Sequence, residues 1–321
     1  MLRCSVLMWK MLPETARRTR VRARCCYIVA TNQLTMPDPQ FPRGKHILIL
    51  ALIFIGGSIL GAIPLVIDSM ASGLDMNDLE AGLDMGESMG RWGFIASATP
   101  LILCILYAWN KMGKPKWTLG FEHVTPVSAL LAIAGTLLVA NGVSATAEYL
   151  PGYESFAEMM KEALVPGIGM ALAVVVVAPI FEEALLRGLI ARGYLRKTSP
   201  AKAIIYSGLI FGAMHLHPVH IFFASIMGFC LGYVYYRTRS LGLVILIHFI
   251  NNAVSYYYGM QADAPDSTET LLGTGPLGVF AFAAVLTAAG VGLLWVFGNK
   301  FPLAPPPAED ELPAEAALAE I

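Results

Sequence analysis

Long apolar runs alternate with short polar loops along most of this chain, and the runs set the expectation for its fold. A helix that crosses the hydrocarbon core of a membrane needs about 20 apolar residues, and most of the runs approach that length. Eight such runs are present: His46–Ile67, Trp92–Trp109, Val127–Ala147, Pro166–Ile190, Ala203–Leu216, Val219–Tyr236, Leu241–Tyr258 and Pro276–Phe297. Ala203–Leu216 is short, but a broken or shallow helix is tolerated where it lines a cavity inside the protein. The pattern predicts an all-α polytopic membrane protein with about eight transmembrane helices.

The charges in the loops between these runs test the count independently. Lysine and arginine gather in the loops after the second, fourth and sixth runs: Lys111, Lys114, Lys116, Arg192, Arg196, Lys197, Lys202, Arg237 and Arg239. The loops after the first and seventh runs are acidic: Asp68, Asp75, Asp78, Glu80, Asp84, Glu87, Asp263, Asp266 and Glu269. Because basic residues beside membrane helices stay on the cytoplasmic side, the alternation predicts an integral membrane protein with both termini cytoplasmic. In a bacterial host the membrane is then the plasma (inner) membrane.

The composition supports this class and excludes others. The chain is 56% hydrophobic and 14% charged, whereas soluble domains carry about 25% charged residues. The net charge of −1 implies no global electrostatic partner, and no nucleic-acid-binding motif is present. The five cysteines have no spacing typical of a zinc site or a disulfide framework. The expected partners are therefore membrane lipid and a membrane-associated substrate, with no nucleic acid.

Charge and apolar content divide the chain into five expected stretches. These are a basic cytoplasmic arm (1–45), the first two spans with an acidic external loop (46–125), a catalytic domain (126–258), an external loop with the last span (259–300), and a disordered acidic tail (301–321). The tail is rich in proline and acidic residues, a composition typical of solvated, disordered ends.

Two segments beside the spans have patterns of their own. Residues 1–36 hold seven lysines and arginines against one acid, which favours a basic juxtamembrane arm over a mitochondrial presequence or a translation start at Met36. Residues 155–165 carry an apolar stripe at helical spacing and predict an amphipathic helix in the membrane interface. Ser155 and Glu158 have the spacing of a capping box at its start.

The most informative stretch is 166–196, where ionisable residues interrupt an apolar run. Charged groups at membrane depth cost roughly 2.5–3.5 kcal/mol each, so they are rare and usually functional. Glu183 and Arg187 are four residues apart on one helical face, which predicts an ion pair. Glu182 is rotated by about 100° from Glu183 and is left unpaired. Pro179, one turn earlier, cannot donate to the carbonyl of its helix and is expected to kink it near the acids.

Two later runs add polar residues at a matching depth. Phe211 and His215 are four residues apart in one run, and His248 and Asn252 are four apart in another. At about 1.5 Å per residue from the basic flanks, the acid, the histidines and the asparagine lie roughly 14–21 Å deep. Glu182 is thus expected to meet them in one layer that is more open to the cytoplasmic side. Histidines inside spans usually face a cavity and mark a site.

The residue types suggest hydrolysis by activated water. A carboxylate with apolar walls suits a base that takes a proton from water, and a neutral imidazole beside it positions that water. A second histidine and an asparagine amide are donors suited to a carbonyl oxygen that becomes an oxyanion. No apt serine nucleophile and no His-Glu-x-x-His zinc helix is present. Two alternatives stay open: a proton-coupled transporter, in which the acid and histidines relay protons, and a non-proteolytic immunity or scaffold protein.

Three motifs together resemble those of the CPBP family of intramembrane proteases. They are Glu-Glu-x-x-x-Arg at 182–187, Phe-x-x-x-His at 211–215 and His-x-x-x-Asn at 248–252, each on an apolar run. The family includes the type II CAAX prenyl endopeptidases and the bacterial Abi-like proteases and bacteriocin-immunity proteins. The resemblance covers roughly residues 126–258. It implies an α-helical membrane endopeptidase with a catalytic chamber inside the bilayer and a membrane-associated substrate, with a prenylated CAAX peptide as the lipidated case.

The resemblance also implies roles for the motif residues. Glu182 would activate water together with His215, while His248 and Asn252 would stabilise the oxyanion. The supporting residues would be Glu183, Arg187 and Phe211, which complete the motifs. We expect no obligatory cofactor. The alternative is zinc held by Glu182, His215 and His248, because a zinc site needs three converging protein ligands.

Overall fold

The structure is a computed structural model that describes residues 38, 40–71, 85–261, 267–307 and 310. Every regular element within these residues is a helix. In chain order the helices are α3 (Gly44–Ala71), α4 (Met85–Lys111), α5 (Pro126–Ser144), the 3-10 turn η1 (Ala147–Tyr149), α6 (Tyr153–Ala163), α7 (Ile168–Ala171), the π-helical segment η2 (Leu172–Val177), α8 (Ala178–Leu185), the π-helical segment η3 (Leu186–Ala191), α9 (Arg192–Leu195), α10 (Pro200–Ala213), α11 (Pro218–Thr238), α12 (Leu241–Gly259), α13 (Thr268–Leu272) and α14 (Pro276–Lys300). The basic arm expected over residues 1–36 lies outside the described part.

Seven helical stretches within the described residues are long and apolar enough to cross a membrane. They are Gly44–Ala71, Ser88–Lys111, Pro126–Tyr149, Ile168–Leu195, Pro218–Thr238, Leu241–Gly259 and Pro276–Lys300. The short span expected at Ala203–Leu216 corresponds to α10, which has 14 residues. The chain is therefore an all-α polytopic membrane protein, as predicted. The division into five stretches stays a prediction.

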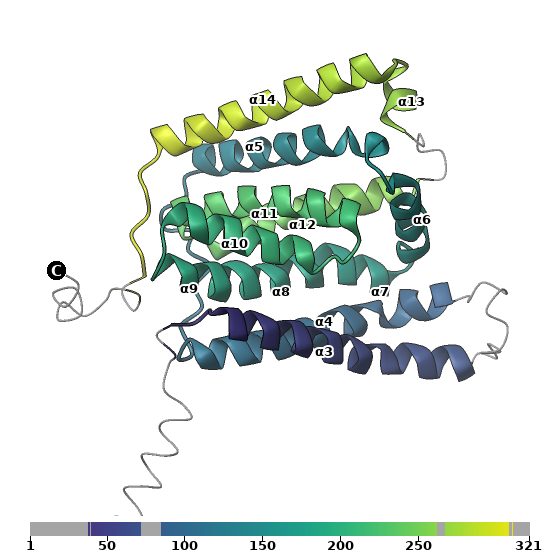
Figure 1. Ribbon diagram of the computed structural model, residues 1–321, viewed down its shortest axis with the longest axis horizontal. Coiled ribbons are helices and arrows are strands. Elements are labelled where there is room, and N and C mark those ends of the chain that lie inside the picture. Colours follow the sequence, from purple (N-terminus) through teal and green to yellow (C-terminus); the bar gives the residue numbers. More distant parts are fainter. Residues whose placement is uncertain (1–37, 39, 72–84, 262–266, 308–309, 311–321) are drawn as a thin grey trace, which may run out of the picture.

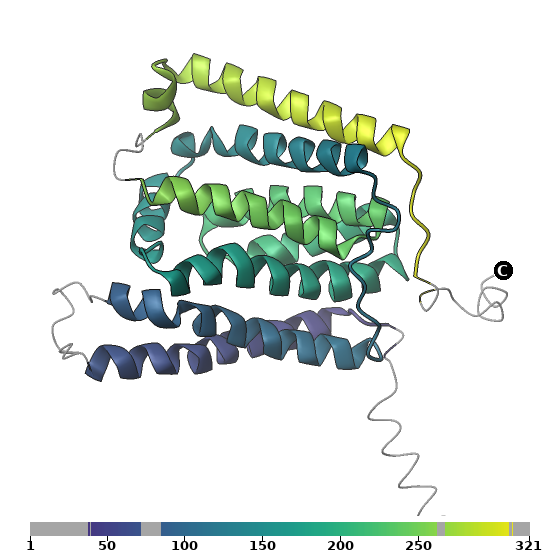
Figure 2. The same ribbon diagram turned by 180° about the vertical axis from the view of Figure 1, so that it is seen from behind.

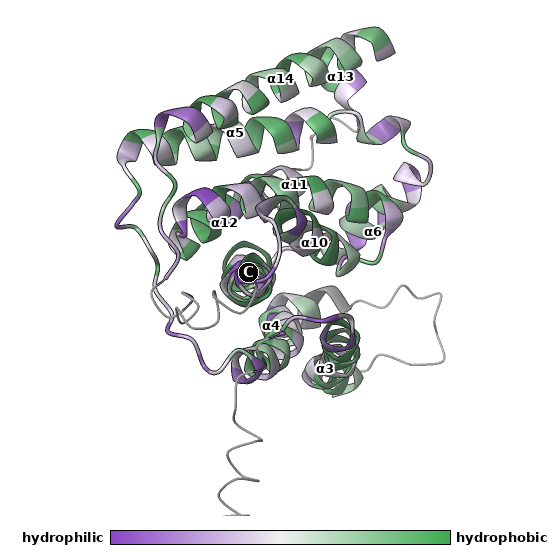
Figure 3. Ribbon diagram, turned by 60° about the vertical axis from the view of Figure 1, so that its left-hand side comes forward, coloured by the Kyte–Doolittle hydropathy of each residue, from purple (hydrophilic) through white to green (hydrophobic). Residues whose placement is uncertain are grey.

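The helices are stacked in layers, and the middle layer carries the polar motifs. In Figure 1, α5 and α14 lie side by side at the top, α3 and α4 at the bottom, and the remaining long helices between them. Figure 2 shows the same layers from behind. Most of the largest fully buried side chains, among them Leu186, Leu231 and Leu243, belong to the middle layer. Figure 3 shows apolar residues over α3 and α14, which form the two outer surfaces expected to face lipid.

Glycines allow two of the helix pairs to approach closely. A Cβ atom on Gly290 of α14 would lie 2.7 Å from the carbonyl oxygen of Gly135 in α5. A Cβ atom on Gly228 of α11 would lie 2.8 Å from the Cα of Gly208 in α10. Small residues at crossing points bring backbones together in membranes, where the hydrophobic effect does not drive helices to pair. These contacts hold α10 and α11 as a tight hairpin beside α8.

The fourth span is not a regular α-helix. Two π-helical segments, η2 and η3, enclose the eight-residue helix α8 that carries Glu182 and Glu183. Within η2 the backbone pairing shifts, and the N–H of Ala178 donates to the carbonyl of Ala173, five residues back. The disruption predicted at Pro179 is therefore present and takes the form of π-helical segments, which are frequent at functional sites.

The amphipathic segment is a helix, but its start differs from the prediction. Helix α6 spans Tyr153–Ala163, with Gly152 at its N-cap in the left-handed conformation at φ 83°. The capping box expected from Ser155 and Glu158 is wrong, because Ser155 Oγ donates to the carbonyl of Gly152 at 3.0 Å from inside the first turn. No residue of α6 is buried, which fits a helix at a surface. The helix closes one end of the middle layer (Figure 1).

The described ends of the chain lie at the opposite end of the layers from α6 (Figure 1). Residues 301–321 were expected to be a disordered acidic tail, but the described part, 301–307 and Asp310, is docked. The N–H of Ala304 donates to the carbonyl of Arg237 at 2.9 Å. Arg192 Nε lies 2.6 Å from Asp310 Oδ2, with side chains only 7% and 6% exposed. This ion pair attaches the tail to the end of the fourth span.

Candidate active site

A fully buried ion pair forms the base of the site. Arg187 Nη1 donates to Glu183 Oε1 at 2.8 Å, and both side chains are 0% exposed. Arg187 Nη2 donates to the carbonyl of Gly228 at 2.7 Å, and its guanidinium lies over the ring of Phe211 at 5.1 Å. The ion pair predicted from the spacing is confirmed. Its two charges compensate each other, which a charge buried in an apolar core requires.

His248 lies between the two adjacent carboxylates. Its Nδ1 is 3.0 Å from Glu183 Oε1, the oxygen that also accepts from Arg187. Its Nε2 is 3.8 Å from Glu182 Oε2, which is close but beyond direct hydrogen-bond range. Since a carboxylate can only accept, Nδ1 carries a proton and donates it to Glu183. The second nitrogen of the ring is thereby oriented toward Glu182.

His215 also contacts the Phe211 ring. Its Nδ1 lies 2.9 Å from the carbonyl oxygen of Phe211, so Nδ1–H donates and Nε2 is left to accept. Phe211 meets His215 edge to face at 5.1 Å and His248 at 5.5 Å. The structure thus brings both histidines to one aromatic ring, and His248 in turn lies beside Glu182. The expected cooperation of Glu182 with His215 stays a prediction.

A strained turn presents His215. The N–H of His217 donates to the carbonyl of His215 at 2.7 Å, which closes a γ-turn with Leu216 at its centre. Leu216 has φ 61° and is 79% exposed. A leucine in this region costs of order 1–3 kcal/mol, and such residues cluster at functional sites. The strain is therefore a second, independent sign that this turn is functional.

Asn252 is bonded to the backbone of the fourth span. Its Nδ2 donates to the carbonyl of Val174 at 2.9 Å, and its Oδ1 accepts from Asn251 Nδ2 at 3.2 Å. One of its two amide hydrogens thus binds the backbone of the π-helical segment η2. This contact crosses between helices, so the sequence pattern of one helix carried no signal for it.

Two further residues, His217 and His220, border the site, and neither was among the expected site residues. The ring of His220, in the first turn of α11, lies 4.1 Å from the ring of His215. His217 Nε2 lies 3.2 Å from Ser155 Oγ of α6. The ring of Phe156, also in α6, contacts the rings of His217 and His220. The sequence could have indicated both residues, because each lies within five residues of His215 in the chain.

The turn that carries His215 lies beside α6. His215 is two residues after Ala213, the last residue of α10, and His217 of the same turn contacts Ser155 of α6. The 14 residues of α10 separate His215 from the basic loop by about 21 Å along the helix, at the upper limit of the expected depth. That the layer is more open to the side of the basic loops stays a prediction.

The donor set is a poor match for the zinc alternative. Of the described residues, no three His, Cys, Asp or Glu side chains gather closely enough to hold a metal ion. His248 and His215 have Nδ1 bound to Glu183 and to the carbonyl of Phe211, which leaves both Nε2 atoms open. The reaction proposed for this site uses no metal.

A buried carboxylate–histidine cluster inside a stack of apolar helices defines the class: a polytopic membrane protein with a polar site at membrane depth. Comparison with known proteins identifies a narrower class of protein. Residues 164–254 match the family described as type II CAAX prenyl endopeptidase Rce1-like. The chain is also 29% identical over 213 residues to "Putative membrane peptidase YdiL" of Bacillus subtilis (strain 168), which covers 64% of this chain and 84% of the relative. No solved structure matches the chain.

These findings confirm the resemblance to the CPBP family that the three motifs indicated. The matched region contains every motif residue, from Glu182 to Asn252. The comparisons support a membrane protease in general terms.

Proposed function

We propose that the protein is an intramembrane endopeptidase that hydrolyses a peptide bond of a membrane-associated substrate with activated water. The observation that carries the proposal is the position of His248, 3.0 Å from Glu183 and 3.8 Å from Glu182 in a buried cluster. Two carboxylates beside one imidazole, with Arg187 compensating one of them, leave Glu182 available for proton transfer. No metal is part of the proposal.

The proposed reaction uses each group once. His215 positions a water molecule, and Glu182 takes a proton from that water. At the same time the water oxygen bonds to the scissile carbonyl carbon. His248, protonated on both nitrogens between the carboxylates, donates Nδ1–H to Glu183 and Nε2–H to the developing oxyanion. Glu182 then returns the proton to the amine nitrogen as the carbon–nitrogen bond breaks. Water has supplied the hydroxyl of the new carboxyl group and one hydrogen of the new amine.

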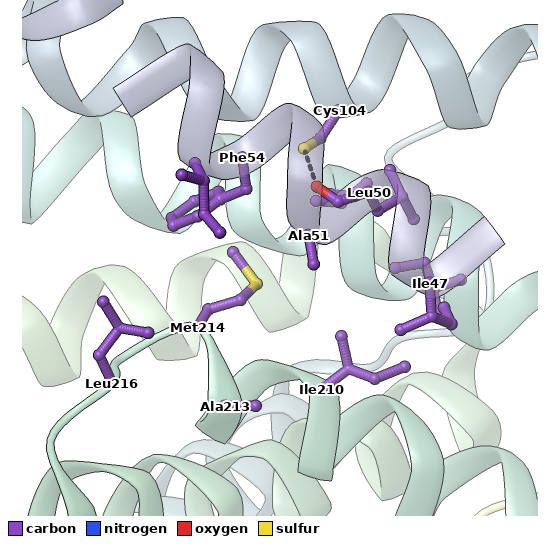
Figure 4. Close-up of a pocket in the computed structure, with 12 residues that line it drawn as sticks. Ile47, Leu50, Ala51, Phe54, Cys104, Ile210, Ala213, Met214 and Leu216 are labelled. Atoms are coloured by element: carbon purple, nitrogen blue, oxygen red, sulfur yellow. Dashed lines mark hydrogen bonds between the residues drawn. The ribbon is translucent and has the colours of Figure 1, made fainter. Parts of the chain in front are cut away.

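An apolar pocket supports a substrate that carries a hydrocarbon chain. The pocket, of about 180 Å³, lies between α3 and the α8–α10 region and is lined by apolar side chains and Cys104 (Figure 4). Met214 and Leu216 line it on either side of His215, and Leu185 lines it three residues after Glu182. A chain lying there would hold an attached peptide beside the site. A prenylated CAAX peptide is the lipidated substrate we propose.

The proposed orientation follows from the basic loops. Three basic residues contact the described chain ends: Arg192 pairs with Asp310, Lys197 donates to the carbonyl of Gln40, and the carbonyl of Arg237 accepts from Ala304. Since basic residues stay on the cytoplasmic side, we place both termini in the cytoplasm, and in a bacterium we place the protein in the plasma (inner) membrane. Single cysteines at Lys114 and Glu148, labelled from one side with an impermeant maleimide in a cysteine-free background, are expected to react from opposite sides.

The deciding experiment measures peptide cleavage by the purified protein in detergent. Wild type, Glu182→Gln, His215→Ala and His248→Ala would be given a fluorogenic prenylated peptide and its unlipidated twin. Wild type is expected to cleave the lipidated peptide faster, and Glu182→Gln to lose at least about 1000-fold in kcat. A chelator is expected to change nothing. Glu158→Gln, on the exposed face of α6, is the matched control. Equal turnover by wild type and Glu182→Gln overturns the proposal.

A further inference from the structure

The carbonyl of Val174 lacks the backbone partner that either an α-helix or a π-helix would give it. In an α-helix it would accept from Ala178, but the N–H of Ala178 donates to Ala173 instead. In a π-helix it would accept from residue 179, five positions on, and this residue is Pro179, which has no N–H. The proline and the π-helical register together exclude both backbone partners.

Asn252 supplies the missing donor from another helix. Its Nδ2 lies 2.9 Å from the Val174 oxygen, and Nδ2 of Asn251 donates to the oxygen of the same amide at 3.2 Å. At membrane depth no water replaces such a bond, and an unpaired backbone group there is costly. The bond therefore ties α12 to the irregular segment immediately before α8.

The segment that Asn252 holds determines where Glu182 lies. Val174 is eight residues, about two helical turns, before Glu182, and Pro179 is one turn before it. A change in the register of η2 would rotate α8 and move the carboxylate away from His248, which now lies 3.8 Å from it. The side-chain hydrogen bonds of Asn252 go to Val174 and Asn251. Among the described residues, none of them goes to Glu182, His215 or His248.

From these contacts we propose that Asn252 is a positioning residue: it fixes Glu182 by capping the carbonyl that Pro179 leaves open. The kinetic consequence rests on the proposed peptidase function, but the contact and its effect on Glu182 do not.

A double-mutant cycle with Pro179→Ala tests this role. Pro179→Ala restores an N–H, so the Val174 carbonyl gains a backbone partner in either helical register. Asn252→Ala is expected to lower Tm clearly in the wild-type background and much less in the Pro179→Ala background. Asn252→Asp keeps the volume but loses the donor, so it should follow Asn252→Ala. Asn141→Ala removes an equivalent bond, Nδ2 to the carbonyl of Leu137, on exposed α5 and should show no coupling to Pro179.

Two readouts report on Glu182 itself. Dicyclohexylcarbodiimide modifies carboxyl groups in apolar surroundings, and mass spectrometry with Glu182→Gln as the blank gives its rate at Glu182. Asn252→Ala is expected to change that rate at least threefold, and Pro179→Ala to restore it. With peptide substrate, Asn252→Ala is expected to lower kcat about tenfold or more at unchanged KM, with most of the loss recovered in the double variant.

The outcomes separate the two proposals. If wild type cleaves no peptide but Tm and labelling show the coupling, the peptidase fails and the positioning role stands. If Asn252→Ala costs the same in both backgrounds by Tm and by labelling, the positioning role is wrong. If Tm and labelling are restored but kcat is not, Asn252 acts on the reacting carbonyl, and the proposed role is again overturned.

Discussion

The Nδ1 atom of His248 lies 3.0 Å from Oε1 of Glu183. The same oxygen accepts from Arg187 at 2.8 Å, so one carboxylate serves an ion pair and orients an imidazole. The three side chains belong to two helices, and all are buried. Glu183 therefore connects the stability of the core to the geometry of the site.

This double role predicts that stability and activity separate in a variant series. Glu183→Gln or Arg187→Met leaves one charge buried without its counter-charge, which costs roughly 3–5 kcal/mol. The double variant Glu183→Gln/Arg187→Met removes both charges and should recover most of that loss in Tm. Its turnover should stay low, because a neutral amide no longer favours the protonated ring of His248. A double variant that is as unstable as the singles, or that recovers activity, would contradict this account.

His215 and His217, on either side of Leu216, should differ sharply in their effect on turnover. His215 positions the water in the proposed reaction, and the loss of such a group typically costs 100-fold or more, roughly 10²–10⁴. His217 instead binds Ser155 of α6 at 3.2 Å. We expect His215→Ala to lose about 100-fold in kcat and His217→Ala to stay within about threefold of wild type. Steady-state kinetics on the lipidated peptide measure both. Comparable losses in the two variants would show that the whole turn acts as a unit.

Contacts within one helix were predictable from the sequence, and contacts between helices were not. Spacing alone gave the Glu183–Arg187 pair, because four residues make about one turn. The Glu183–His248 contact depends on how two helices rotate against each other, which no single-helix pattern contains. For the same reason the bond between Asn252 and the carbonyl of Val174 could not be predicted.

Backbone irregularity was foreseen only in part. Pro179 indicated a disturbance near the acids, but helical spacing does not show that π-helical segments absorb it on both sides of α8. The start of α6 was predicted at the wrong residue because serine is a common N-cap residue. The helix begins instead after Gly152, which adopts the left-handed conformation. The spans themselves were close to the prediction, since the length of an apolar run is set by the thickness of the membrane.

The α5–α14 contact should be intolerant of a single methyl group. A Cβ on Gly290 would meet backbone atoms of α5 at 2.7 Å, whereas a Cβ on Gly292 has nothing within 4 Å. Gly290→Ala is expected to lower the free energy of unfolding by about 1–3 kcal/mol through overpacking. Gly292→Ala on the same helix should be neutral or slightly stabilising, since alanine favours helices by about 1 kcal/mol over glycine. Thermal unfolding in detergent compares the two, and equal Tm values would mean that the helices adjust at no cost.

The strained turn at Leu216 should trade stability against substrate binding. Glycine adopts φ 61° without strain, so Leu216→Gly is expected to raise stability by about 1 kcal/mol. Both Leu216→Gly and Leu216→Ala remove part of the pocket wall and should raise KM for the lipidated peptide but not for its unlipidated twin. Leu216→Ala keeps the backbone strain and serves as the control for stability. An unchanged KM in both variants would remove Leu216 from the substrate pocket.

The docked tail should be held in place by Asp310. Its carboxylate lies 2.6 Å from Arg192 Nε, and Arg196 Nε is 3.5 Å from its second oxygen. A hydrogen bond to a charged group contributes roughly 1.5–3 kcal/mol, so Asp310→Ala should release residues 301–307 from the carbonyl of Arg237. Limited trypsin digestion should then cut faster after Lys300, which is exposed at the end of α14. Glu162→Ala, an exposed acid on α6, removes the same charge and should leave that cleavage rate unchanged. Cleavage after Lys300 at the wild-type rate in Asp310→Ala would mean that the backbone contact of Ala304 alone anchors the tail.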